Sequence, residues 1–99
     1  MELVDDAGPP VDEAAVATVV DARGMLCAQG ILRLMRTMLS VAPAGVVKVL
    51  SSDPAAEHDY PAWCRTTGHR FLGHRQEPDP RWGALIVTFV QKLAGDPSS

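Results

Sequence analysis

Cys27 is the residue of this 99-residue chain whose type and position best suit covalent chemistry. It follows Asp21-Ala22-Arg23-Gly24-Met25-Leu26 and precedes a helically periodic segment. We therefore expect an exposed thiol at a strand-to-helix junction, near the positive helix end where backbone N–H groups lack partners. The thiolate is the reactive form of cysteine, and such surroundings favour it. Structural cysteines are usually buried, so position alone leaves a reactive and a structural role for Cys27 equally open.

Four neighbours of Cys27 are candidates to support its thiolate. A helix end by itself lowers a thiol pKa by only ~0.7 unit, which leaves the thiolate a minority at neutral pH. Arg23, four residues earlier, would add a cation, although exposed loop charges are more often simply solvated. If Cys27 is the N-cap, the Gly30 amide is placed to donate a hydrogen bond to its sulfur. Gly24 and Ala28 flank the site in the same segment.

The second cysteine and the histidines have simpler interpretations. Cys64 falls within an expected helix, where a small apolar residue packed on the sheet is favoured over a resolving or relay thiol. His58, His69 and His74 match no zinc-ligand spacing, so we predict no metal and no other cofactor.

The remaining aromatic and acidic candidates are assigned mainly to structure. Trp63 and Phe71 are expected at the edge of the core, and Asp59 near a helix start. Trp82, beside Arg81 in a turn, is either packing or an anchor for a partner protein, because Trp and Arg are enriched in binding hot spots.

Hydrophobic periodicity predicts six elements in the order βαβαββ. The expected strands are 15–21, 46–51, 69–74 and 84–90, and the expected helices are 28–41 and 54–67. This order predicts the α+β class: a two-layer α/β sandwich with a four-stranded mixed sheet and both helices on one face. The stripe Ile31, Leu34, Met35 and Met38 is then core.

Composition is that of one ordinary globular domain, with 46% hydrophobic and 21% charged residues. We expect a flexible acidic leader at 1–13, an ordered domain at 14–93 and a flexible tail at 94–99. Without a signal-peptide pattern or a long apolar run, we expect a cytoplasmic protein that does not enter membranes. A formal net charge of −3 disfavours direct nucleic-acid binding.

Several motifs at matching separations resemble the TusA/SirA-like sulfur-carrier family over about residues 17–92. They are Asp21-x-Arg23-Gly24-Met25-x-Cys27, Ser52-Asp53-Pro54-Ala55, Asp59-x-Pro61-x-x-Cys64 and Gly68-His69. The resemblance implies a βαβαββ fold similar to the C-terminal domain of bacterial translation initiation factor three. In this chain the family's Cys-Pro-x-Pro is replaced by Cys27-Ala28-Gln29-Gly30.

The resemblance also implies a function. Cys27 would accept sulfur as a persulfide from a donor protein, such as a cysteine desulfurase or a rhodanese-type protein, and pass it to an acceptor protein. The chain would then be a covalent sulfur carrier rather than a stand-alone enzyme. The missing prolines suggest an alternative, a noncatalytic protein-interaction module of the same fold that has lost sulfur transfer.

Overall fold

The computed structural model describes residues 15–93, which form six elements in the predicted order βαβαββ. The strands are β1 (Val16–Ala22), β2 (Val46–Ser51), β3 (Arg70–Asp79) and β4 (Gly83–Gln91). The helices are α1 (Cys27–Met38) and α2 (Ala56–Thr67). The expected leader and tail lie outside the described residues.

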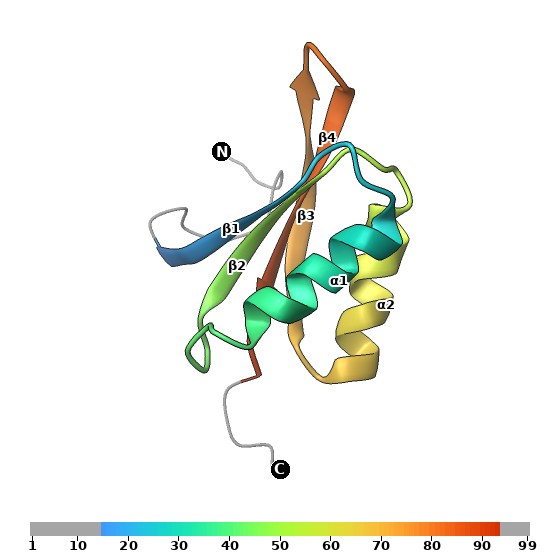
Figure 1. Cartoon of the computed structure of the whole chain (residues 1–99). Coiled ribbons are helices and arrows are strands. Elements are labelled where there is room, and N and C mark those ends of the chain that lie inside the picture. The colour runs from blue at the N-terminus through green and yellow to red at the C-terminus, as the bar shows by residue number, and fades with distance from the viewer. Residues whose placement is uncertain (1–14, 94–99) are drawn as a thin grey trace, which may run out of the picture.

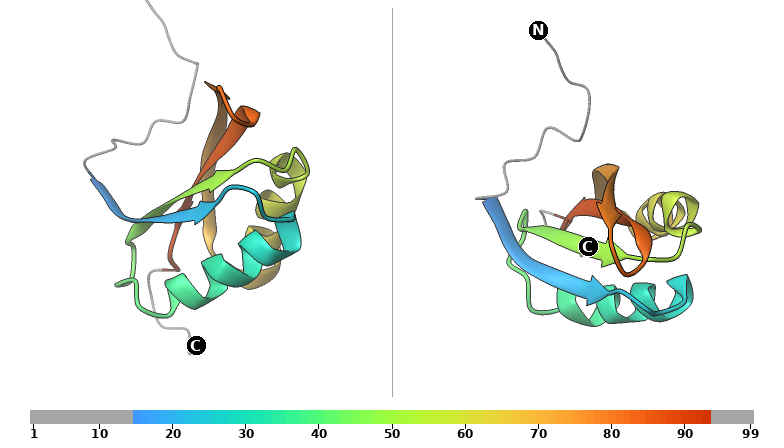
Figure 2. Two further views of the ribbon diagram at one scale, coloured as in Figure 1. Left: turned by 45° about the horizontal axis from the view of Figure 1, so that its top comes forward. Right: turned by 90° about the horizontal axis from the view of Figure 1, so that it is seen from above.

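The strands form one mixed sheet in the order β1-β2-β4-β3, with β1 parallel to β2 and the other neighbours antiparallel. Both helices lie side by side on one face of this sheet (Figures 1 and 2), which confirms the predicted two-layer α+β sandwich. Because β1 and β2 run in parallel, the loops that follow them meet at one edge. The loop into α1 therefore lies beside the start of α2.

The main core lies between the sheet and the helices. Its largest fully buried members include Leu34 of α1, Tyr60 of α2 and Val49 of β2. A second cluster on the other face of β4 includes Val87 and Phe89, as the alternation of side chains along a strand requires.

Several element bounds and one core residue differ from the expectations; α1, for example, ends at Met38 rather than at residue 41. β3 is longer than predicted because it runs on to Asp79 through Pro78; as an edge strand it tolerates a proline. Met35 is not core, since 47% of it is exposed. The buried line of α1 instead runs through Gly30, Leu34 and Met38, and Met35 points away from it.

Neither α1 nor α2, the helices of the described part, has the length and apolar character needed to cross a membrane.

Candidate functional site

Cys27 is the first residue of α1, and its side chain is directed inward. Only 6% of the residue is exposed, which contradicts the expected exposed thiol. The helix cap is Leu26, not Cys27. Because the cap lies one residue earlier than expected, Cys27 is itself part of α1. It lies on the helix face that also contains Gly30 and Leu34, and this face packs against the core.

The segment from Gly24 to Cys27 is tied to the start of α2 by two hydrogen bonds. The Cys27 amide donates to Oδ2 of Asp53 at 2.9 Å, and the Gly24 amide donates to Oγ of Ser52 at 2.8 Å. The other oxygen of Asp53 accepts from the Ala55 amide at 3.0 Å. One carboxylate thus satisfies free N–H groups at the starts of both helices and holds them together.

The surroundings of Cys27 favour the neutral thiol. Burial raises its pKa to about 12, with further increases from a hydrogen bond to the Asp59 carboxylate and from the charges of Asp59 and Asp53. The sequence-based argument expected a lowered pKa and was wrong in direction. Burial and two carboxylates outweigh a favourable helix end, which is worth only ~1 kcal/mol.

Gly30 has a different role from the one expected. Its amide donates to the Leu26 carbonyl at 3.1 Å, in the first turn of α1, rather than to the sulfur of Cys27. A Cβ at this position would lie 2.5 Å from Oη of Tyr60 and 3.1 Å from Cβ of Ala22. Glycine therefore allows α1 to approach Tyr60 closely.

Arg23 is engaged by Asp21. Its guanidinium donates from Nε and Nη2 to the two carboxylate oxygens of Asp21, both at 2.8 Å. These hydrogen bonds lower the pKa of Asp21 to about 2, while Arg23 is not among the groups that shift the pKa of Cys27. Ala28 is exposed on the first turn of α1.

Gly24 supports the turn before Cys27 and contacts the β3–β4 turn. Its φ of +80° lies in the left-handed region that favours glycine, and a Cβ there would lie 3.2 Å from the Trp82 ring. Trp82 is 39% exposed, and the Arg81 guanidinium lies 5.2 Å from the centre of its ring. Trp82 thus packs on the Cys27 loop and also presents a surface to solvent.

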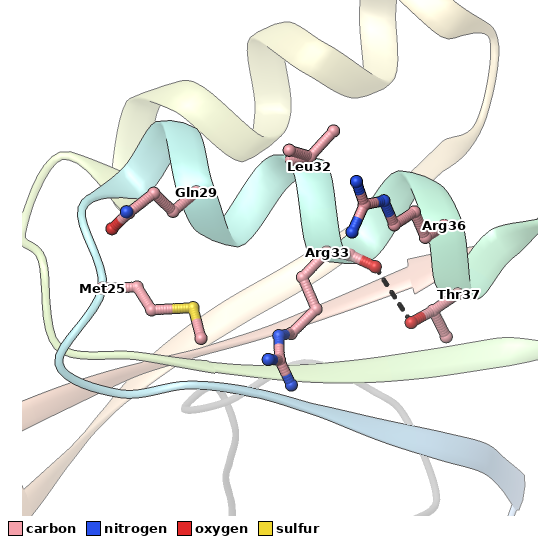
Figure 3. A pocket seen from close by; sticks show the side chains of 6 residues that line it. All are labelled: Met25, Gln29, Leu32, Arg33, Arg36 and Thr37. Atoms are coloured by element: carbon pink, nitrogen blue, oxygen red, sulfur yellow. Dashed lines mark hydrogen bonds between the residues drawn. The ribbon is translucent and has the colours of Figure 1, made fainter.

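The outer side of α1 carries a hollow beside the Cys27 loop (Figure 3). Leu32, Arg33 and Arg36 line it from the helix, and Met25 lines it from the preceding loop. Leu32 is largely exposed, and α1 contains two arginines and no acidic residue. A net acidic chain therefore presents a basic, partly apolar surface next to its candidate nucleophile.

Cys64 is buried in α2, as predicted, and burial raises its pKa to about 11. His69 accepts a hydrogen bond from the Leu93 amide and stacks on Trp63, so it serves packing. Within residues 15–93, no three His, Cys, Asp or Glu side chains converge as a metal site would require.

Sequence reasoning identified Cys27 but missed the parts played by Asp53, Asp59 and Tyr60. The two aspartates were assigned only to helix starts and to the resembled motif, and Tyr60 was not singled out. Asp59 and Tyr60 follow the second strand by several residues, and only packing of α2 on α1 brings them to Cys27. The signal available in the sequence was that both aspartates belong to motifs that carry the same family resemblance as the motif with Cys27.

Comparisons with known proteins place the sequence among sulfur carriers. The sequence profile of the family described as Sulfurtransferase TusA matches residues 18–88, from β1 into β4. A sulfur carrier protein TusA of Pseudomonas syringae pv. tomato is 29% identical over 68 residues, 69% of this chain and 81% of the relative. The protein of the same name from Pseudomonas entomophila is 34% identical over 58 residues, 59% of this chain and 72% of the relative. That of Pseudomonas aeruginosa is 30% identical over 63 residues, covering 64% and 80% respectively.

Proposed function

The chain belongs to the TusA sulfurtransferase family and is a sulfur carrier, and we propose that Cys27 is the residue that takes the sulfur, as a persulfide. One observation carries the choice of Cys27. Its backbone amide donates to Asp53 at the junction of both helices, and the Asp59 carboxylate acts on its thiol and raises the pKa of Cys27. Cys64 lies in the core, and no carboxylate among residues 15–93 is found to act on its pKa.

Transfer requires a defined movement of protons and sulfur. The Cys27 thiol loses its proton to water or to a base of the docked donor, since the Asp59 carboxylate opposes the thiolate. The Cys27 sulfur then bonds to the terminal sulfur of the donor's persulfide, and the donor's own S–S bond breaks. The donor cysteine leaves as a thiolate and recovers a proton, so sulfur is transferred without an external oxidant.

The buried thiol suits a carrier that must not react between partners. Oxidation follows thiolate character and exposure, and Cys27 has little of either in the described structure. Loading therefore requires the first turn of α1 to open, and docking of the donor supplies the opening. The exposed Leu26, next to Cys27, is part of the surface that a donor must contact.

The basic hollow on α1 is the surface on which we place the donor protein. Arg33 and Arg36 favour a partner with acidic side chains, and Leu32 and Met25 add apolar contacts to the same surface. A charge reversal at both arginines should raise the donor concentration needed for half-maximal loading about tenfold or more. Loading by a small inorganic polysulfide should be unchanged, because that reagent needs no docking surface.

Mass spectrometry of the full chain tests Cys27 directly. After incubation with a cysteine desulfurase and its substrate, or with a loaded rhodanese-type protein, the chain should gain one sulfur that reductant removes. Cys27→Ser should abolish the gain, and Cys64→Ala should keep it. Circular dichroism shows whether each variant is folded. A sulfur gain in folded Cys27→Ser, or no gain in the unmodified chain from any donor, would contradict the proposal; the second result favours the noncatalytic interaction module.

A further inference from the structure

Tyr60 places a buried hydroxyl over the first turn of α1. The residue is fully buried, and Oη lies 2.5 Å from the position that a Gly30 Cβ would occupy. Residues 27 and 30 share one helix face, with Cβ positions about 5–6 Å apart, and helical side chains lean towards the N-terminus. The hydroxyl therefore lies on the face from which the Cys27 side chain projects.

The Tyr60 hydroxyl is oriented by Ser51 at the end of β2. Oγ of Ser51 donates to Oη of Tyr60 across a long 3.4 Å hydrogen bond. Since that bond uses the oxygen of Tyr60, the phenolic proton is left for another acceptor. Burial raises the pKa of Tyr60 to about 12, and Cys27 is among the groups that raise it, so the hydroxyl is a proton donor at physiological pH.

An anionic sulfur on Cys27 would be stabilised by a hydrogen bond from this phenolic proton. The charged groups acting on it are the carboxylates of Asp59 and Asp53, which both oppose an anion. No cation among residues 15–93 is found to act on it, yet both the attacking thiolate and the persulfide anion carry negative charge. A neutral hydrogen-bond donor is the group in this site that favours the charged form.

We propose that the Tyr60 hydroxyl donates a hydrogen bond to the sulfur anion on Cys27, both before and after sulfur is loaded. The part of this proposal that concerns the loaded persulfide rests on the proposed function. Ser51 turns the phenolic proton towards Cys27, and the added sulfur, on a bond of about 2.05 Å, reaches further into the space beside the hydroxyl. The group involved belongs to α2, so the two helices share the site.

The same contact accounts for glycine at the second altered position of the motif, residue 30. Gly30 occupies the position of the second proline in the resembled motif, and any residue with a Cβ there would meet Oη of Tyr60 at 2.5 Å. Such close contact requires the hydroxyl to move. Glycine at 30 and tyrosine at 60 are therefore a matched pair, in which the hydroxyl takes the space of a side chain.

The test compares Tyr60→Phe with the parent in a Cys64→Ala background, so that only Cys27 reacts. Alkylation of the unloaded thiol by iodoacetamide is measured between pH 7 and about pH 10. Loss of a hydrogen bond to a charged sulfur should slow alkylation about tenfold at each pH below the pKa. A change that merely loosened the packing would expose Cys27 and accelerate alkylation, which is the opposite sign.

Two further measurements keep the proposal testable. Ser51→Ala retains Tyr60 but removes the hydrogen bond that orients its hydroxyl, and should slow alkylation about threefold. This variant replaces Tyr60→Phe in the test if Tyr60→Phe does not fold. Chain loaded with inorganic polysulfide is alkylated on its terminal sulfur, and Tyr60→Phe should slow this step as well. Equal or faster alkylation of the unloaded thiol in folded Tyr60→Phe would overturn the proposal. Failure of Cys27 to load sulfur would overturn the proposed function while leaving the unloaded comparison valid.

Discussion

Replacing Asp59 by asparagine should make Cys27 more reactive. The substitution keeps the size of the side chain and one oxygen acceptor, but removes the negative charge that opposes the thiolate. Asp59 acts on the Cys27 pKa both through a hydrogen bond and through its charge, second only to burial. Asp59→Asn should therefore lower the pKa without restoring an ordinary value, since burial is unchanged.

The expected size follows from the strength of the hydrogen bond. Hydrogen bonds to charged groups contribute about 1.5–3 kcal/mol and neutral ones about 0.5–1.5 kcal/mol. The difference of about 1–1.5 kcal/mol corresponds to about one pKa unit. The pKa of Cys27 should thus fall from about 12 to roughly 11, and alkylation at pH 8 should be about tenfold faster because the thiolate fraction limits the rate.

The assay is the rate of iodoacetamide alkylation against pH in a Cys64→Ala background. Glu57→Gln is the matched control, because it removes the same charge from the first turn of α2. Glu57 bonds to the Gln76 side chain and is not among the groups that shift the Cys27 pKa. The reasoning fails if Asp59→Asn reacts no faster than the parent, or if Glu57→Gln accelerates alkylation equally.

Three other outcomes are expected. Gly30→Ala should destabilise the chain by about 1–3 kcal/mol through the 2.5 Å contact with the Tyr60 hydroxyl, and by clearly less in Tyr60→Phe; equal losses in urea unfolding would refute the contact. Cys64→Ala should cost about 1 kcal/mol or more in the same assay because the thiol is buried, with sulfur loading kept; full stability with lost loading would instead make it a relay. Above about pH 8 the free energy of unfolding should fall, approaching a slope of about 1.4 kcal/mol per pH unit for each buried thiol. The unfolded thiols ionise near 9.0, whereas Cys27 and Cys64 hold their protons to about 12 and 11, so the unfolded chain binds fewer protons across this window. Cys27→Ala should flatten that fall, and an unchanged slope would contradict the raised pKa.

Local sequence patterns determined the elements and their order. The β-branched run at β2 predicted its bounds correctly, and the expected helix end at residue 67 was confirmed, with Gly68 following in the left-handed conformation. These features depend on propensities and on spacing within a few residues, so the printed sequence contains them. The position of Cys27 at the start of a helix could be derived in the same way.

Tertiary packing decided the chemistry around Cys27. Whether its thiol is exposed depends on which side of α1 faces α2, and a shift of the cap by one residue to Leu26 turned the side chain inward. The pKa then follows from Asp53 and Asp59, which are distant in sequence and reach the thiol only through the meeting of two helix starts. Burial and charge depend on distances in space, which no local pattern encodes. The sequence therefore determined where the nucleophile stands, and only the tertiary structure decided that it is held neutral and enclosed.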